Sequence, residues 1–448
     1  MLSALTHLFK HLRGVGLGAI LIRGTLSVGA IRIANKAITL VAAVVLARIL
    51  GAQGYGFYAY AMAVVTTIAI PAQIGLPQLV TREIAAAEAR REYSLMRGMR
   101  RRALQLASVS VVLGSLVGCA ILLVSVHIPA INPAVFALAM LLLPLQIGLA
   151  LLASMLRGLR FVVQSTWPQI ALQPLLFLLL IFISMRYLTA WNAMALNLIA
   201  TAVALVVLVK IFQKHWPEDA NRFAPTYHTR AWLMSLLPFT MMAGINLINK
   251  KTDILMLGFF SSASDVGVYT VVFQGAMLVS LPLTAVNAVL APNIARLYTQ
   301  GDHQRLQRLI TVATLATSLV AGIAGLGLIL VGRWLLASVF GNDFADGYPV
   351  LAILCIGQLM NTLAGSVSMF LNMTGHEKDA LKGATVSAML NVILNALLIP
   401  YFGMVGAAIA TAISLMIWNI LLGILVFKRL RLVAGPFGAR IKATSESK

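Results

Sequence analysis

The sequence predicts an all-α polytopic membrane protein with about twelve transmembrane helices in two pseudo-symmetric six-helix bundles. Three observations lead to this fold class. Of the 448 residues, 60% are hydrophobic and only 10% are charged, and the mean hydropathy is +0.92. The apolar residues form about twelve stretches, each near the roughly 20 residues that a helix needs to cross a bilayer. The two halves of the chain also repeat one another. A chain of this composition is typical of a membrane protein rather than of soluble domains.

The expected spans follow one another with short polar connections. They are residues 24–50, 54–78, 103–126, 134–156, 166–188, 191–213, 232–258, 267–292, 309–331, 349–373, 383–400 and 404–427. They divide the chain into an interfacial segment (1–23), an N-terminal bundle (24–213), a polar linker (214–231), a C-terminal bundle (232–427) and a basic tail (428–448). Prolines inside several spans, such as Pro168 and Pro282, indicate kinked helices, because neighbouring groups can pair with the freed backbone atoms.

The distribution of basic residues predicts the orientation. If both termini are cytoplasmic, 27 of the 34 Lys and Arg residues fall in inner tails and loops. Only Arg186 and Arg333 then fall in outer loops, which is the asymmetry that the positive-inside rule predicts. The formal charge of +21 is therefore explained by topology and contact with anionic headgroups. We expect membrane lipids, and no nucleic acid, as partners.

An internal repeat appears at an offset near 211 residues. Gly56 and Tyr58 match Gly267 and Tyr269, and Pro71 matches Pro282. Late in each half, residues 199–205 resemble residues 409–415. Repeats of this kind are a transporter architecture whose substrate site lies near the midplane at the repeat interface.

Five cationic residues lie inside predicted spans. Arg32, Lys36 and Arg48 are in the first span, and Lys250 and Lys251 are in the seventh. A cation at the bilayer centre costs about 2.5–3.5 kcal/mol on insertion scales, so such residues usually mark a substrate path. Arg and Lys both suit phosphate. We therefore predict an anion-binding site from these residues, with Arg48 equally able to reach a headgroup at the membrane surface.

Polar neighbours extend this candidate site. Asn35 lies beside Lys36, and Asn249 beside Lys250. Asp253 is the only acidic residue deep in a span, and it could couple an ion or proton or neutralise Lys250 or Arg32. Asn246 shares the three-and-four spacing of Asn249, Lys250 and Asp253. Further amides that could line a cavity or form interhelical hydrogen bonds are Gln274, Asn287, Asn391 and Asn395.

The sequence carries no enzyme signature. No Gly is followed by Lys, so the phosphate-loop motif is missing. The seven His residues and the two Cys residues, Cys119 and Cys355, form no metal-binding or disulfide pattern. We expect neither catalysis nor a cofactor.

Several long stretches resemble the polysaccharide-export flippases, the O-antigen and exopolysaccharide translocases of the multidrug/oligosaccharidyl-lipid/polysaccharide superfamily. They are residues 46–85, 253–302, 340–354 and 391–414, and the similarity extends over nearly all of 24–427. Their order and spacing carry the resemblance, because no single motif is diagnostic.

The resemblance implies two six-helix bundles that flip undecaprenyl-pyrophosphate-linked sugar repeat units from the inner to the outer leaflet by alternating access. The family's cationic cavity matches Arg32, Lys36 and Lys250 by position in the first and seventh spans. We expect a monomer in the bacterial inner membrane, working with a polysaccharide polymerase and a chain-length regulator.

Three other functions compete with this interpretation. A drug or cation exporter of the same superfamily would place carboxylates in its cavity, whereas this chain has one deep acid against five cations. A membrane polymerase or ligase needs a large outer loop, and the longest one expected here is about 332–348. A scaffold protein has no need of costly buried charges.

Overall fold

The computed structural model describes residues 17–70 and 75–435, and every regular element among them is a helix. The chain forms two compact units. The first unit comprises Met1–Ile49, Val65–Leu123 and Pro133–Ala243. The second comprises Leu50–Val64, Val124–Asn132 and Gly244–Lys448. The predicted boundaries of the bundles, 24–213 and 232–427, remain a prediction.

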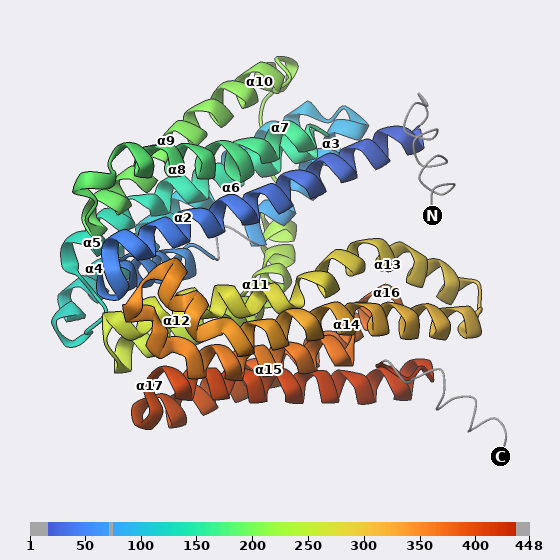
Figure 1. Cartoon of the computed structure of the whole chain (residues 1–448). Coiled ribbons are helices and arrows are strands. Elements are labelled where there is room, and N and C mark those ends of the chain that lie inside the picture. Colours follow the sequence, from blue (N-terminus) through green and yellow to red (C-terminus); the bar gives the residue numbers. More distant parts are fainter. Residues whose placement is uncertain (1–16, 71–74, 436–448) are drawn as a thin grey trace. The chain divides into compact units, whose positions relative to one another are not determined.

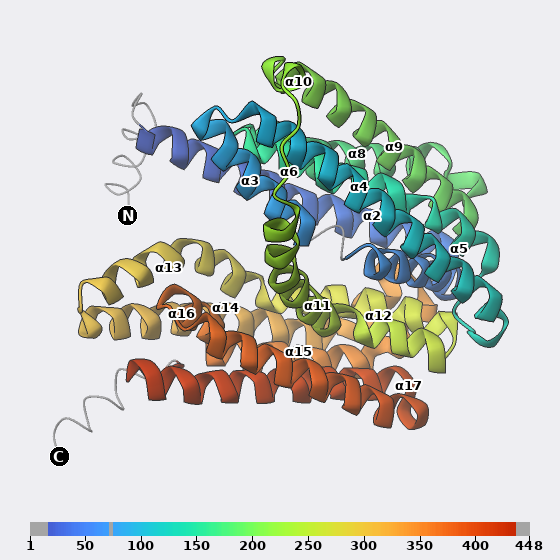
Figure 2. The same cartoon turned by 180° about the vertical axis from the view of Figure 1, so that it is seen from behind.

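The first half of the described chain is helical throughout, with short connections between the helices (Figures 1 and 2). In chain order they are α2 (Leu17–Ile68), α3 (Leu76–Arg90), α4 (Tyr93–Val124), η2 (Ser125–His127), α5 (Pro133–Met140), α6 (Leu142–Gly158), α7 (Val162–Trp167), the π-helix η3 (Pro168–Leu172), α8 (Gln173–Ile183), η4 (Met185–Tyr187), α9 (Ala190–His215) and α10 (Asp219–Arg222). In the first unit, α6 packs against α3 and α9, and α8 packs against α9.

The second half continues in the same way. Its helices are α11 (Thr229–Phe260), α12 (Ala263–Ala276), η5 (Met277–Ser280), α13 (Leu281–Thr299), α14 (His303–Leu335), η6 (Leu336–Phe340), η7 (Asn342–Gly347), α15 (Tyr348–Ala364), α16 (Val367–Met373) and α17 (Glu377–Leu430). In the second unit, α15 packs against α14 and α17, and α13 packs against α14 (Figure 1). Nine helices of the described residues are long and apolar enough to cross a membrane. The chain is a multi-pass membrane protein, as the composition predicts.

Two glycines separate consecutive spans without a loop. Gly51 breaks α2 at φ 67° and ψ 178°, and Gly403 breaks α17 at φ 53° and ψ −132°. Both positive φ values suit glycine, which has no Cβ to clash with its own backbone. These breaks fall between predicted spans 24–50 and 54–78 and between spans 383–400 and 404–427. Counting α2 and α17 as two helices each turns the nine into eleven, and α11 (Thr229–Phe260), which is not among the nine, brings the number to twelve, as predicted.

The span predicted over 54–78 is shorter than expected. Helix α2 ends at Ile68, and α3 begins at Leu76 with Pro77 in its first turn. Proline is favoured there because its missing N–H would have no helical partner in any case. Residues 76–78 therefore belong to a separate helix that continues to Arg90.

The segment between the halves is attached to the start of α4 within the first unit. Arg97 Nη1 donates to the carbonyl oxygen of Phe223 at 2.7 Å, and the N–H of Thr226 donates to the carbonyl oxygen of Ser94 at 3.1 Å. The guanidinium of Arg100 lies 5.1 Å from the ring centroid of Trp216. Arg97 and Arg100 therefore hold the linker against the start of α4.

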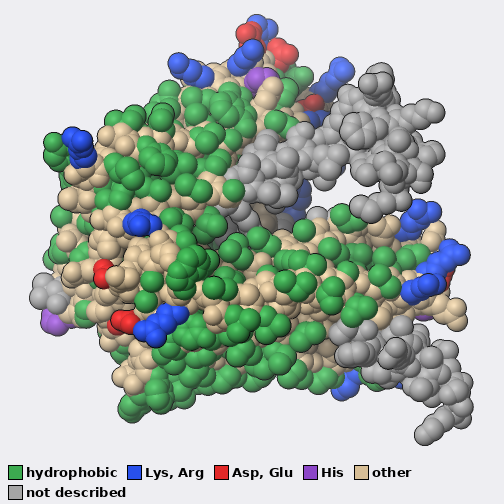
Figure 3. All heavy atoms as spheres, viewed as in Figure 1, with side chains coloured by type: hydrophobic (Ala, Val, Ile, Leu, Met, Phe, Trp, Pro, Cys, Tyr) green, Lys and Arg blue, Asp and Glu red, His purple; other side chains and the backbone are tan. Residues whose placement is uncertain are grey.

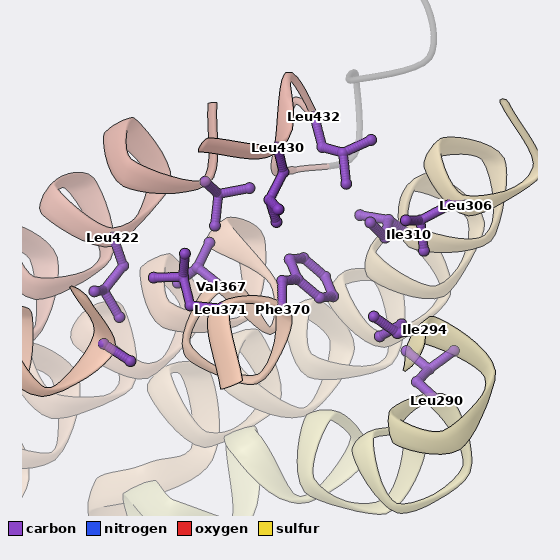
Figure 4. Close-up of a cluster of buried hydrophobic side chains, with 12 residues drawn as sticks. Leu290, Ile294, Leu306, Ile310, Val367, Phe370, Leu371, Leu422, Leu430 and Leu432 are labelled. Carbon is purple, nitrogen blue, oxygen red and sulfur yellow. The ribbon is translucent and has the colours of Figure 1, made fainter. Parts of the chain in front are cut away.

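A cluster of buried hydrophobic side chains lies within the second unit (Figure 4). It joins helices α13, α14, α16 and α17, with Phe370 and Leu371 among its most buried members. Two polar contacts flank it. Gln307 forms a pair of 2.9 Å hydrogen bonds with the backbone N–H and carbonyl oxygen of Val433. Arg429 Nε donates to Asp379 Oδ2 at 2.8 Å, which joins the two ends of α17.

Candidate functional site

The predicted cations lie on α2 and α11. The side chains of Arg32, Lys36 and Lys250, like those of Asn246 and Asn249, lie outside what the structure describes. Arg48 is exposed near the end of the first part of α2, and Lys251 is partly buried on α11. The anion site that these residues are predicted to form therefore remains a prediction.

Asn35 has a structural partner within the first unit. Its Nδ2 donates to the carbonyl oxygen of Ile170 at 2.5 Å. Ile170 belongs to the π-helix η3, which begins at Pro168, a residue without a backbone N–H. A π-helical turn interrupts the regular i to i−4 hydrogen bonds, and such turns occur frequently at functional sites. The amide of Asn35 thus fixes the irregular part of the fifth span against the first.

Asp253 lies in a network of neutral donors within the second unit. The residue is 5% exposed. Its Oδ2 accepts hydrogen bonds from Tyr269 Oη at 2.8 Å and from Thr411 Oγ1. Its Oδ1 accepts from Asn391 Nδ2 at 3.2 Å and from Asn395 Nδ2 at 2.9 Å. The partners come from α12 and from both parts of α17, so the carboxylate joins four helical segments.

The four donors fill the hydrogen-bonding capacity of an ionised carboxylate, which offers about four lone-pair positions. An unpaired buried carboxylate would cost several kcal/mol, and these hydrogen bonds provide its compensation. None of the four groups is charged. The sequence also predicted that Asp253 could form an ion pair with Lys250 or Arg32. The side chains of those two residues lie outside what the structure describes, so this pairing stays a prediction.

Two amide oxygens beside Asp253 have no partner among the described residues. They are Oδ1 of Asn391 and Oδ1 of Asn395, whose residues are 3% and 0% exposed. Buried amide oxygens are normally hydrogen-bonded. Carboxylate, hydroxyl and amide oxygens together are the ligands that hard cations prefer. The cluster therefore offers the oxygen ligands that a cation would need if it replaced one or more of the hydrogen bonds to Asp253.

The repeat places a different polar cluster at the equivalent position of the first unit. Thr201, which matches Thr411, accepts a hydrogen bond from Gln173 Nε2 at 2.8 Å. Its own hydroxyl donates to the carbonyl oxygen of Asn197 at 2.7 Å. The matching threonines therefore differ in their partners, because Thr201 accepts from the uncharged amide of Gln173 and Thr411 donates to the carboxylate of Asp253.

The remaining predicted amides take part in hydrogen bonds between helical segments. Gln274 Nε2 donates to Tyr55 Oη at 3.4 Å, and Asn287 accepts from the hydroxyl of Ser366. The expectation of interhelical hydrogen bonds is thus confirmed for Gln274, Asn287, Asn391 and Asn395. Sequence reasoning did not find Tyr269 and Thr411 as partners of Asp253. The sequence feature that could have drawn attention to them is their position in the repeat, where Tyr269 matches Tyr58 and Thr411 matches Thr201.

Family comparison agrees with the fold. The profile of the polysaccharide biosynthesis protein family matches residues 21–298, which is more than half of the chain. The chain belongs to this family. The profile of the MatE family also matches, over residues 238–397.

Curated relatives match over shorter stretches. The chain is 27% identical over 169 residues to a probable low-salt glycan biosynthesis flippase, Agl15, and 31% identical over 202 residues to a probable flippase, AglR, both of Haloferax volcanii. It is 24% identical over 247 residues to the succinoglycan biosynthesis transport protein ExoT of Rhizobium meliloti. These matches cover 38%, 43% and 52% of this chain, and 36%, 42% and 47% of the respective relatives. The chain thus spans less than half the length of the relatives it matches.

Solved structures share the fold over most of the chain. An inward-facing multidrug resistance MATE family transporter of the MOP superfamily aligns with a TM-score of 0.71 at 15% identity, covering 89% of this chain and 94% of that chain. The lipid II flippase MurJ in an inward closed conformation aligns at 0.66 and 16% identity, covering 89% and 87%. At these identities the likeness establishes the fold alone, a membrane protein with about twelve helices in two bundles.

Proposed function

We propose that this protein is a flippase for undecaprenyl-pyrophosphate-linked oligosaccharide repeat units in surface polysaccharide (O-antigen or exopolysaccharide) synthesis. It moves them by alternating access from the inner to the outer leaflet of the bacterial inner membrane. Three findings support this proposal. The chain belongs to the polysaccharide biosynthesis protein family, its relatives include proteins named as flippases, and it shares a fold with a lipid II flippase. The act is transport, without a chemical step on the sugar.

The shortage of acidic residues in the predicted spans carries the argument for an anionic substrate. Asp253 is the only acidic residue deep in a predicted span, against five cations. Among the described residues its carboxylate accepts hydrogen bonds from four uncharged donors. One carboxylate is too few for Arg32, Lys36 and Lys250, so these cations need another anion to offset the cost of placing them in a span. A pyrophosphate headgroup is such an anion, and it suits both guanidinium and ammonium groups.

Vesicle transport tests the proposal. Purified protein is reconstituted with a fluorescent undecaprenyl-pyrophosphate oligosaccharide, and the fraction reached by an external glycosidase is followed over time. We expect Arg32→Ala, Lys36→Ala and Lys250→Ala each to slow flipping at equal protein content, and Lys36→Arg to retain more activity than Lys36→Ala. Lys210→Ala, an exposed cation on α9, is the matched control. Unchanged flipping in all three alanine variants would refute the anion site.

The same vesicles separate this function from that of a multidrug or cation exporter, which shares the fold. An exporter would move lipophilic cations, and the pyrophosphate lipid would not compete with them. For the flippase we expect faster movement of the pyrophosphate lipid when the donor side is negative, because each negative charge that leaves that side gains about 2.3 kcal/mol per 100 mV. The charge distribution predicts that both termini are cytoplasmic. Labelling of the loop near Arg305 from outside intact cells would contradict this predicted topology.

We further propose that the polar cluster around Asp253 binds the coupling ion, a monovalent cation that replaces one or more of the four hydrogen bonds to this carboxylate. The fit rests on a buried carboxylate, two hydroxyls and the unpartnered oxygens of Asn391 and Asn395. The test compares the melting temperature of purified protein in NaCl, KCl and choline chloride. Asp253→Asn should remove the ion-specific shift that the wild type shows. Asp346→Asn, an exposed acid of the second unit, should keep it. Equal responses of the two variants would exclude an ion at Asp253.

A further inference from the structure

A basic cleft lies between α13 and α14 in the second unit. Its volume is about 640 Å³. Its polar lining comes from Asn293 and Arg296 on α13, from Gln300 directly after α13, and from Arg305 and Arg308 on α14. Figure 3 shows Lys and Arg side chains gathered over this end of the α13–α14 hairpin. The charge distribution predicts that this end of the hairpin is cytoplasmic.

The cleft keeps a net positive charge after its local ion pair is counted. Asp302, the N-cap of α14, lies 3.3 Å from Arg305 through Oδ2 and Nε. Its carboxylate also accepts the backbone N–H of Arg305 at 3.0 Å. One carboxylate therefore faces three guanidinium groups. Arg296 and Arg308 come from opposite walls, so together they can contact one phosphate from two sides.

An exposed apolar stripe on α14 continues from this cleft. The cleft itself includes Val312, and the stripe runs on through Leu315, Leu319 and Ile323, each more than half exposed. Spacings of three and four residues put these side chains on one helix face, and Arg305 and Arg308 precede them on that face. The opposite face of α14 is buried, through Leu306 and Ile310 among others. The outward face of α14 is thus basic at its start and apolar along its length.

We propose that this cleft binds an anionic phospholipid of the cytoplasmic leaflet. The phosphate diester lies between Arg296 and Arg308, and one acyl chain lies along Val312, Leu315 and Leu319. A soluble anion would use only the basic end of this surface, whereas an anionic lipid uses both its charged and its apolar parts. This site is separate from the predicted cations on α2 and α11, and it does not depend on which substrate the protein moves.

Lipid binding to the purified protein tests the proposal. Delipidated protein is titrated with phosphatidylglycerol or phosphatidylcholine in detergent, and bound lipid is counted by native mass spectrometry. A basic side chain near an anionic lipid contributes about a fivefold preference. We therefore expect Arg296→Ala and Arg308→Ala each to lower the preference for phosphatidylglycerol about fivefold, and the double variant about thirtyfold. Arg101→Ala, an exposed arginine of the first unit, is the matched control and should leave it unchanged.

A second measurement locates the acyl chain. Tryptophan is introduced as Val312→Trp in the stripe or as Val109→Trp on the exposed face of α4, and quenching by acyl-brominated lipids in mixed vesicles is recorded. Stronger quenching by brominated phosphatidylglycerol than by brominated phosphatidylcholine is expected at 312 only. If Arg296→Ala and Arg101→Ala lower the preference for phosphatidylglycerol equally, the protein attracts anionic lipid in general and the proposed site is wrong. Displacement of the lipid by inorganic phosphate at equal concentration would show a free-phosphate site instead.

Discussion

Two glycines that match in the repeat meet at a helix crossing inside the second unit. Gly56 lies on α2 beyond its break, and Gly267 lies on α12. A Cβ built on Gly56 would lie 1.7 Å from the carbonyl oxygen of Ala263, and a Cβ built on Gly267 would lie 2.1 Å from the carbonyl oxygen of Ala52. Each glycine therefore faces backbone of the other helix. We predict that alanine at either position forces the two helices apart.

The magnitude follows from these distances. A carbon normally approaches a carbonyl oxygen no closer than about 3.3 Å, so each substitution requires a displacement of roughly 1.5 Å. The obstacle is backbone, and no rotamer change can relieve it. Overpacking costs about 1–3 kcal/mol and sometimes more, while replacing a helical glycine by alanine returns at most about 1 kcal/mol. We expect a net loss of about 2 kcal/mol for Gly56→Ala and for Gly267→Ala.

The two substitutions should not be additive. They open the same crossing, so once the first has separated the helices, the second finds part of its space already made. Residues in contact commonly show coupling of about 0.5–3 kcal/mol. The double variant should therefore lose less than the sum of the single variants, by about 1 kcal/mol or more.

Equilibrium unfolding in mixed detergent micelles, followed by circular dichroism as the fraction of sodium dodecyl sulfate rises, measures these losses. Gly322→Ala on α14 is the control, because no atom lies within 4 Å of a Cβ built there. It should be neutral or slightly stabilising. If Gly56→Ala unfolds at the same detergent fraction as Gly322→Ala, the close approach of the two backbones is wrong.

Two further predictions concern contacts at the ends of helices. Arg429→Ala should destabilise the second unit by about 1 kcal/mol in the same assay, because it leaves the buried carboxylate of Asp379 with only the more distant Lys382 as an ion-pair partner. Lys428→Ala removes an exposed charge one residue away and should not change the stability. Equal losses in the two variants would argue against the ion pair. Arg97→Ala should raise the rate of trypsin cleavage at Arg222 in the linker about fivefold, because it removes the hydrogen bond to the carbonyl oxygen of Phe223, which is worth about 1 kcal/mol. Cleavage at the wild-type rate would show that other contacts hold the linker.

The sequence alone was enough for the spans and their separation. A bilayer demands about 20 apolar residues per crossing, and that demand acts on each helix without regard to its neighbours. The predicted breaks near 51–53 and 401–403 accordingly coincide with Gly51 and Gly403. Where the local signal was weaker, the boundary shifted: the span expected over 54–78 ends at Ile68, and α3 begins at Leu76.

The partners within the second unit were decided by tertiary structure. The repeat identified Gly56 and Gly267 as equivalents, yet nothing in the sequence shows that they cross at backbone contact. Asp253 was conspicuous as a lone acid, but its four donors lie 16 to 158 residues further along the chain. Which of many buried polar groups meet depends on how helices pack, and in lipid that packing is set by close fit and hydrogen bonds rather than by an apolar pattern. The sequence therefore determined where the apolar helices lie along the chain, and only the fold determined which four described residues donate hydrogen bonds to Asp253.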